Sequence, residues 1–124
     1  MKVLITGGAG FLGRRLAKAL LQRGTLKNAE GVEENIEQLI LFDVVPALGI
    51  TDARVQVVTG DVADPGVLED VIDAETTSIF HLAAVVSSEA ESDFDLGVRT
   101  NLDASRHLFE TCRGIEKKKK IIFA

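Results

Sequence analysis

The sequence predicts an α/β fold, a doubly wound parallel sheet of five strands with helices on both faces. Three observations point to it. Short apolar runs alternate with stretches of helical periodicity, a glycine-rich segment joins the first run to the first helix, and an acidic residue follows each of the next two runs. Strands that alternate with helices favour parallel βαβ units with right-handed crossovers. We therefore expect the strand order 3-2-1-4-5.

Five apolar runs are the expected strands. Each is short, is rich in branched or aromatic residues and ends in small or polar residues, as buried strands do. They are residues 3–5, 39–42, 55–59, 78–82 and 121–123.

Three stretches predict helices, because their apolar residues recur at helical spacing. The first begins near Leu12 and ends at Gly24, which stands where a C-cap glycine belongs. In the second, Asp64 and Pro65 fit the N-cap and first helical positions. The third covers roughly residues 91–112. The apolar residues of the second and third helices are Val67, Leu68, Val71 and Ile72, then Phe94, Val98, Leu102, Leu108 and Phe109.

Two connections need a separate interpretation. Residues 25–38 are long for a link from helix to strand, which usually takes about 2–6 residues. This segment carries Glu30, Glu33, Glu34 and Glu37, so we expect a solvated acidic excursion. The lysines at 117–120 are expected to form a solvated turn before the last strand; a phosphate or membrane patch is the alternative.

Composition excludes several classes of protein. The 124 residues suit one domain, and 14 Lys+Arg against 19 Asp+Glu give a charge of −5, which argues against a nucleic-acid partner. Cys112 is the single cysteine, which rules out an internal disulfide and fits a reducing compartment. There is no signal-peptide layout and no apolar run near the about 18 residues that span a membrane. We therefore expect a cytoplasmic protein without a membrane partner.

The segment 6–13 carries the chemistry. Gly7 permits a tight turn after the strand, Gly10 lets backbone N–H groups approach a pyrophosphate, and Gly13 lets the helix pack closely on the sheet. The helix N-terminus adds free N–H groups and the positive end of the helix dipole. Because the glycines follow a strand and open a helix, the pattern predicts a Rossmann-type dinucleotide site. A glycine-rich turn without a ligand is the alternative.

Asp43 closes the second strand, where a carboxylate accepts hydrogen bonds from the adenosine ribose. It lies 30 residues beyond Gly13, against the usual spacing of about 20, and the acidic excursion accounts for the excess. A carboxylate here repels a 2′-phosphate, so it favours NAD over NADP. Arg14 and Arg15 would favour a phosphate, but we expect them to face solvent. A simple turn role is the alternative for Asp43.

The ends of the third and fourth strands add further candidates. Asp61 can accept from an adenine amino group while Val62 packs on the ring; an Asx turn is the alternative. The small Ala83 and Ala84 let the backbone pass close to the nicotinamide-side ribose. His81 is expected to be a buried structural residue, and His107 an exposed residue of the long helix.

These motifs together resemble the extended short-chain dehydrogenase/reductase family, also called NAD-dependent epimerase/dehydratases. The resemblance rests on the glycine pattern at 6–13, the acid at 43, Gly-Asp-Val at 60–62, His-Leu-Ala-Ala at 81–84 and Asn101. Segments 41–45, 83–89 and 94–97 resemble a branch that acts on sugar acids. The cofactor positions that the resemblance implies are Gly7, Gly10, Phe11, Leu12, Gly13, Asp43, Asp61, Val62, Leu82, Ala83, Ala84 and Asn101.

The resemblance also implies a reaction. Family members bind NAD and move a hydride between the nicotinamide and a hydroxyl or keto carbon, here of a sugar acid or a nucleotide sugar. Ser87, Ser88 and Glu89 would lie near the substrate, or form a polar loop with a helix cap. The helix at 91–112 would pair two copies in a homodimer, with core packing as the alternative. No metal is implied.

The catalytic residues that the family uses are not in this sequence. The family's acid/base is a tyrosine followed four residues later by a lysine, and this chain has no Tyr. We therefore expect residues 1–124 to be the NAD-binding part of a longer enzyme, truncated after the fifth strand, with no catalytic residue and no activity alone.

Two rival functions stay open from the sequence. A methyltransferase also places a glycine-rich loop after its first strand, but its cofactor has no pyrophosphate. A non-catalytic NAD-binding regulatory module would explain the missing tyrosine without truncation.

Overall fold

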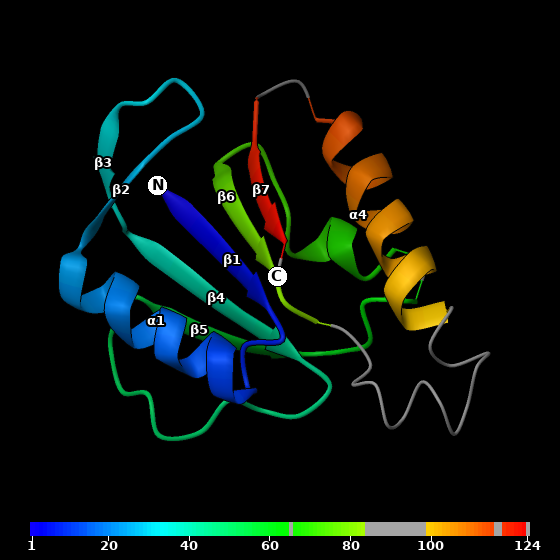
Figure 1. Cartoon of the computed structure of the whole chain (residues 1–124), viewed down its shortest axis with the longest axis horizontal. Helices are drawn as coiled ribbons and strands as arrows, with labels where there is room; N and C mark the ends of the chain where they lie inside the picture. Colours follow the sequence, from blue (N-terminus) through cyan, green and yellow to red (C-terminus); the bar gives the residue numbers. More distant parts are fainter. Residues whose placement is uncertain (65, 84–98, 116–117, 124) are drawn as a thin grey trace.

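A computed structural model describes residues 1–64, 66–83, 99–115 and 118–123 of the chain (Figure 1). Strands and helices alternate from residue 55 onward, whereas four strands follow one another between residues 25 and 59. In chain order the elements are β1 (Lys2–Thr6), α1 (Phe11–Arg23), β2 (Thr25–Lys27), β3 (Glu33–Asn35), β4 (Gln38–Asp43), β5 (Val55–Thr59), η1 (Leu68–Asp70), β6 (Thr76–His81), η2 (Arg99–Asp103), α4 (Ala104–Arg113) and β7 (Lys120–Phe123).

The main sheet has five strands in the order β5-β4-β1-β6-β7, and every neighbouring pair is parallel. This is the predicted order 3-2-1-4-5, with β1 in the centre. The sheet lies between α1 on one face and η1 with α4 on the other (Figure 1). The predicted doubly wound α/β fold is therefore confirmed.

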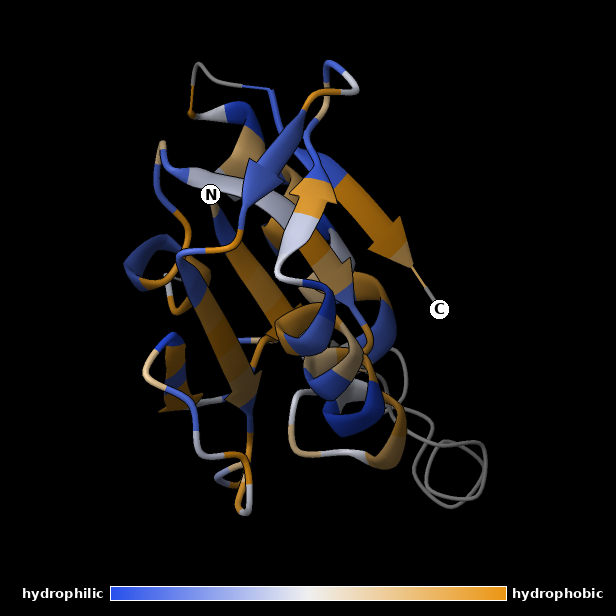
Figure 2. Ribbon diagram, turned by 90° about the vertical axis from the view of Figure 1, so that its left-hand side faces the viewer, coloured by the Kyte–Doolittle hydropathy of each residue, from blue (hydrophilic) through white to orange (hydrophobic). Residues whose placement is uncertain are grey.

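The alternation of side chains along β1 fills both cores. Val3 and Ile5 pack with Ala17 of α1, whereas Leu4 points to the opposite face and packs with Leu108 of α4. All five of these residues are fully buried, because a central parallel strand is covered on both faces. Figure 2 shows the apolar strands inside the molecule and hydrophilic residues on the outer surfaces of the helices.

The first helix ends as predicted. Gly24 adopts φ +77 and donates its N–H to the Leu20 carbonyl, which is the left-handed C-cap that glycine favours.

The acidic excursion is more ordered than its composition suggests. Strands β2 and β3 pair in an antiparallel hairpin separate from the main sheet. Two contacts anchor it: Ile36 donates its N–H to the Gly24 carbonyl at 2.9 Å, and the Met1 amino group donates to the Asn35 carbonyl at 2.6 Å. Strands of three residues are too short to show the alternation by which strands are recognised.

The predicted helix that starts at Asp64 is wrong. Among the described residues of this segment, which leave out residue 65, the helical structure is one 3₁₀ turn, η1. Gly66 adopts φ +83, a left-handed conformation that an α-helix cannot contain. The apolar residues of the segment are nevertheless buried against the sheet, so the periodicity identified the core face and overestimated the helix. These residues are Leu68, Val71 and Ile72.

Only part of the predicted helix at 91–112 is described. It consists of a π-helical turn, η2, followed by α4, while residues 91–98 lie outside the described residues. Within the described part of the chain, no helix is both long and apolar enough to cross a membrane.

Candidate functional site

The loop between β1 and α1 is compact because its glycines touch other backbone atoms. A Cβ on Gly13 would lie 2.2 Å from the Gly7 carbonyl oxygen, and a Cβ on Gly7 would lie 2.9 Å from the Ala83 nitrogen. Gly7 also adopts φ +75, a region that side chains rarely adopt. Side chains at these two positions would force the loop apart.

Gly10 differs from the other two glycines. A Cβ there would meet only the Gly7 carbonyl oxygen, at 3.4 Å, so its outer side is open. Gly10 is the N-cap of α1, and the first helical hydrogen bond runs from the Arg14 N–H to its carbonyl at 3.0 Å. The N–H groups of the first turn therefore lack helical partners and, with the helix dipole, favour an anion. The loop and the first turn of α1 therefore fit a pyrophosphate.

Asp43 holds this loop against β4. One carboxylate oxygen accepts the Ala9 N–H at 3.0 Å and the other accepts the Val44 N–H at 2.7 Å. Gly8 adds a second tie, because its N–H donates to the Phe42 carbonyl at 3.0 Å. A carboxylate offers about four lone-pair sites, so two hydrogen bonds leave capacity for ribose hydroxyls. Its role in shaping the loop was not visible in the sequence.

At the end of β5, Asp61 forms the Asx turn that was the alternative to a role in adenine binding. Asp61 accepts the Ala63 N–H at 2.9 Å, an Asx turn. Val62, expected to pack on an adenine ring, is 5% exposed and packs in the core with Phe42 and Leu68. Its side chain therefore has little free surface for a ligand.

The end of β6 meets the loop through a buried polar contact. His81 Nδ1 and Thr6 Oγ1 are 2.7 Å apart, and the same hydroxyl oxygen accepts the Ala83 N–H at 3.2 Å. His81 is buried, as predicted for a structural histidine, and this burial lowers the pKa of its imidazole. Thr6 was not singled out from the sequence, because a threonine at the end of a strand is ordinary.

Stability should fall as the pH is lowered below about 6.5, the ordinary pKa of histidine. Burial lowers the pKa of His81 in the folded protein, so between the two pKa values the unfolded chain binds a proton that the folded protein does not. The slope for one such group is at most about 1.4 kcal/mol per pH unit. Urea unfolding at a series of pH values from 7.5 to 5.5 measures it, and His81→Asn should flatten the profile. An unchanged slope in that variant would contradict the assignment.

The remaining candidates lie at the start of α1, on η2 or outside the described residues. Phe11 and Leu12 are exposed at the start of α1. Arg15 faces solvent as expected, with its guanidinium 5.3 Å from the Phe11 ring. Asn101 is exposed on η2. Four expected positions, Ala84, Ser87, Ser88 and Glu89, lie outside the described residues.

Two expectations about polar side chains need correction. His107 is half-buried rather than exposed, because α4 turns this position toward the protein. Its Nδ1 has no hydrogen-bond partner among the described residues. Arg14 is also half-buried; a Cβ built on Gly49 would lie 3.1 Å from its guanidinium. Arg14 therefore lies beside the loop that follows β4, which sequence periodicity could not show.

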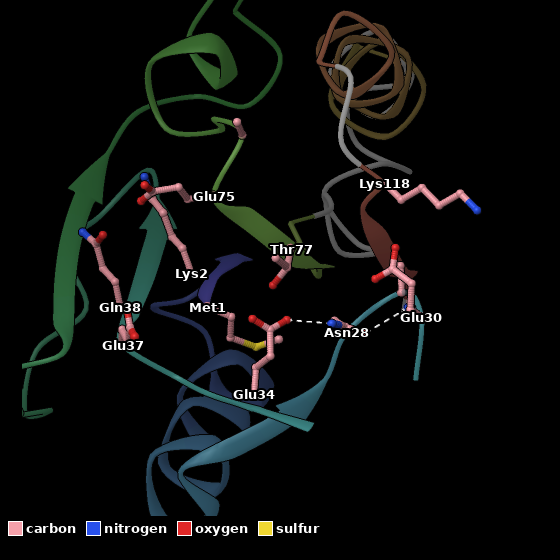
Figure 3. A pocket seen from close by; sticks show the side chains of 12 residues that line it. Met1, Lys2, Asn28, Glu30, Glu34, Glu37, Gln38, Glu75, Thr77 and Lys118 are labelled. Atoms are coloured by element: carbon pink, nitrogen blue, oxygen red, sulfur yellow. Dashed lines mark hydrogen bonds between the residues drawn. The ribbon is translucent and has the colours of Figure 1, made fainter. Parts of the chain in front are cut away.

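A cavity of about 840 Å³ lies at the other edge of the sheet, at the amino ends of β1, β4 and β6 (Figure 3). Its lining includes Lys2, Glu34, Gln38 and Thr77, and it contains no residue that the sequence predicted for the site. Among the described residues, no group of three or more His, Cys, Asp or Glu side chains is arranged to hold a metal.

Comparison with known proteins matches nearly the whole chain. The model of a family described as the NAD dependent epimerase/dehydratase family matches residues 3–124. D-erythronate dehydrogenase of Cupriavidus necator is 60% identical over 99% of this chain, and D-erythronate dehydrogenase of Haemophilus influenzae is 46% identical over all of it. The chain spans 38% and 37% of the lengths of these two relatives.

A solved structure shares the fold closely. The nucleoside-diphosphate-sugar epimerase from Agrobacterium tumefaciens superimposes with a TM-score of 0.85 at 36% identity, over 99% of this chain and 36% of that protein.

Proposed function

We propose, since the chain belongs to the NAD dependent epimerase/dehydratase family, that residues 1–124 form an NAD-binding domain. The observation that carries the proposal is the loop from Gly7 to Gly13. Its backbone contacts leave no room for a Cβ at Gly13, while the outer side of Gly10 is open. Such a loop at the N-terminus of a helix binds the pyrophosphate of a dinucleotide.

The adenosine half of the cofactor would lie between this loop and the end of β4. There Asp43 accepts from the ribose hydroxyls, and Asp61 lies at the end of the neighbouring strand β5. Gly10, Phe11, Leu12 and Gly13 supply the pyrophosphate site. Three exposed apolar residues after Asp43 are further candidates for contact with adenosine, which the sequence analysis missed: Val44 and Val45, which follow it directly, and Leu48.

The nicotinamide half would lie across the loop, beside the end of β6. Leu82 and Ala83 stand there, next to Gly7, and Ala84 follows them in the sequence. We propose that the other residues near the nicotinamide and the substrate are Asn101, Ser87, Ser88 and Glu89.

The proposed reaction of the whole protein is hydride transfer with a sugar acid. Bound NAD supplies C4 of its nicotinamide as the hydride acceptor. The two D-erythronate dehydrogenases, at 60% and 46% identity, support D-erythronate as the substrate. The nucleoside-diphosphate-sugar epimerase at 36% identity supports a nucleotide sugar as the second candidate. The family's tyrosine acid/base is not among these residues, because the sequence has no Tyr.

Asp43→Ala should weaken NAD binding and remove the preference of the protein for NAD over NADP. The ribose loses a charged acceptor worth about 1.5–3 kcal/mol, and the Ala9 N–H loses its partner in the loop. Asp43→Asn is the matched control, because it keeps one acceptor oxygen and removes the charge that repels a 2′-phosphate. Titrations with NADH and NADPH measure both affinities. Equal affinity for the two cofactors in the unmutated protein would contradict the role of Asp43.

We further propose that η2 and α4 form a contact between two copies of the protein. Leu102 and Phe109 support this, since each exposes half or more of its surface, and large exposed apolar side chains on one helical segment mark contact sites.

A further inference from the structure

We infer that the hydrogen bond between Thr6 and His81 is a clamp that fixes the end of β6 against the glycine loop, so that both are positioning residues for the nicotinamide half of NAD. The inference rests on the proposed function and adds to it two buried residues that lie outside the phosphate and adenosine sites proposed above.

The clamp joins residues that are distant in sequence and adjacent in the sheet. Thr6 and His81 are register partners at the carboxyl ends of β1 and β6. The 2.7 Å contact between Oγ1 and Nδ1 is buried, and the two residues are 0% and 5% exposed. Water therefore cannot replace either partner, and the loss of one leaves the other unsatisfied.

The Thr6 hydroxyl also connects to the chain beyond β6. It accepts the Ala83 N–H at 3.2 Å, while the Thr6 carbonyl accepts the Leu82 N–H at 3.1 Å. A hydroxyl has one hydrogen and two lone pairs. With Ala83 donating to the oxygen, its hydrogen is free to point at the unprotonated Nδ1 of a neutral His81. Burial, which lowers the pKa of His81, maintains that neutral form.

The glycine loop has two separate supports. On the side of β4, the carboxylate of Asp43 holds Ala9 and the Phe42 carbonyl holds Gly8. On the side of β6, Gly7 lies so close to the chain that a Cβ would be 2.9 Å from the carbonyl carbon of Leu82, and the clamp fixes that approach. The first support acts on the adenosine half of the site and the second on the nicotinamide half.

A ligand that touches one half should therefore respond differently from a ligand that touches both. In the proposed site, ADP would contact the loop and the end of β4, and NADH would also contact the end of β6. Removal of the clamp should reduce NADH affinity and leave ADP affinity nearly unchanged. A general loss of folding would reduce both.

The experiment compares two pairs of variants. Thr6→Val and His81→Leu remove the hydrogen bond with little change of volume, and His81→Leu keeps an apolar side chain against Phe123, whose ring lies 5.6 Å from the imidazole. Thr6→Ser and His81→Asn are the matched controls, since each keeps a polar atom at the position of Oγ1 or Nδ1. Calorimetric titration of each protein with ADP and with NADH gives the two affinities.

We expect the removal variants to bind NADH about three- to tenfold more weakly, the range for one lost hydrogen bond. Their ADP affinity should stay within about twofold, and both control variants should resemble the unmutated protein. The double variant Thr6→Val/His81→Leu should lose no more NADH affinity than Thr6→Val alone, because Thr6→Val already removes both the contact with His81 and the acceptor of the Ala83 N–H.

Three results would overturn the clamp. ADP and NADH affinities that fall together, in either removal variant, would show a general structural role. If neither the ADP affinity nor the NADH affinity changed in any variant, the contact between Thr6 and His81 would be dispensable for cofactor binding. An unmutated protein that binds neither ligand would overturn the proposed function with it, and the absence of ADP binding distinguishes that result from the other two.

Discussion

Gly13→Ala is expected to abolish ADP and NADH binding and to destabilise the fold. The new Cβ would lie 2.2 Å from the Gly7 carbonyl oxygen and 3.0 Å from the Gly8 Cα. Both are backbone atoms of a loop that is tied to β4 and β6, so no flexible side chain can move away. Such overpacking costs about 1–3 kcal/mol and occasionally more, and the relief of the clash displaces the N–H groups that face the pyrophosphate.

Two glycine variants separate fold from binding. Gly10→Ala places its Cβ 3.4 Å from the nearest atom, so the fold should remain within about 1 kcal/mol of the unmutated protein. ADP affinity should still fall, because the methyl group stands where the phosphates approach. Gly114→Ala, with its nearest neighbour at 3.6 Å and far from the loop in sequence, should change neither property. Chemical denaturation and ADP titration measure the three variants, and normal stability in Gly13→Ala would contradict the described loop.

Phe42→Ala should produce the largest loss of stability, about 3–5 kcal/mol. Phe42 is fully buried in the core formed with Val62 and Leu68. A Cβ on Gly60 would lie 2.9 Å from its ring, so the ring fills the space beneath the end of β5. Its backbone carbonyl also accepts the Gly8 N–H, so the cavity would form in the core beside the strand end that supports the glycine loop.

Phe11→Ala is the matched control for this prediction. Phe11 is 77% exposed, and exposed substitutions usually change the free energy of unfolding by less than about 0.5 kcal/mol. Urea denaturation of both variants gives the comparison. A loss below about 1 kcal/mol for Phe42→Ala would mean that the core is packed differently.

The sequence predicted the sheet because its signals are local and strong. The apolar runs that became β1, β4 and β6 are buried on both faces, which makes them nearly continuous in hydrophobicity. The glycine spacing predicted the turn and the helix. The end of the second apolar run placed Asp43 at the same edge of the sheet, because parallel strands bring their carboxyl ends together.

The features that the sequence did not predict depend on contacts between distant segments. The hairpin of β2 and β3 is too short for periodicity to reveal. The segment after Asp64 has helical spacing, but Gly66 takes a left-handed conformation. Residues 6 and 81 are ordinary in sequence, and only the register of β1 against β6 brings their side chains together.

The most direct test of the account is to map where ADP binds. Backbone amide NMR spectra recorded during an ADP titration should show saturable shifts for Gly7, Ala9, Gly10 and Gly13 and for Val44, whose N–H reports on Asp43. The amides that line the cavity at the amino edge, among them Lys2 and Glu34, should stay unchanged. Saturable shifts confined to that cavity, or no shifts at all, would contradict the proposal that the glycine loop is a dinucleotide site.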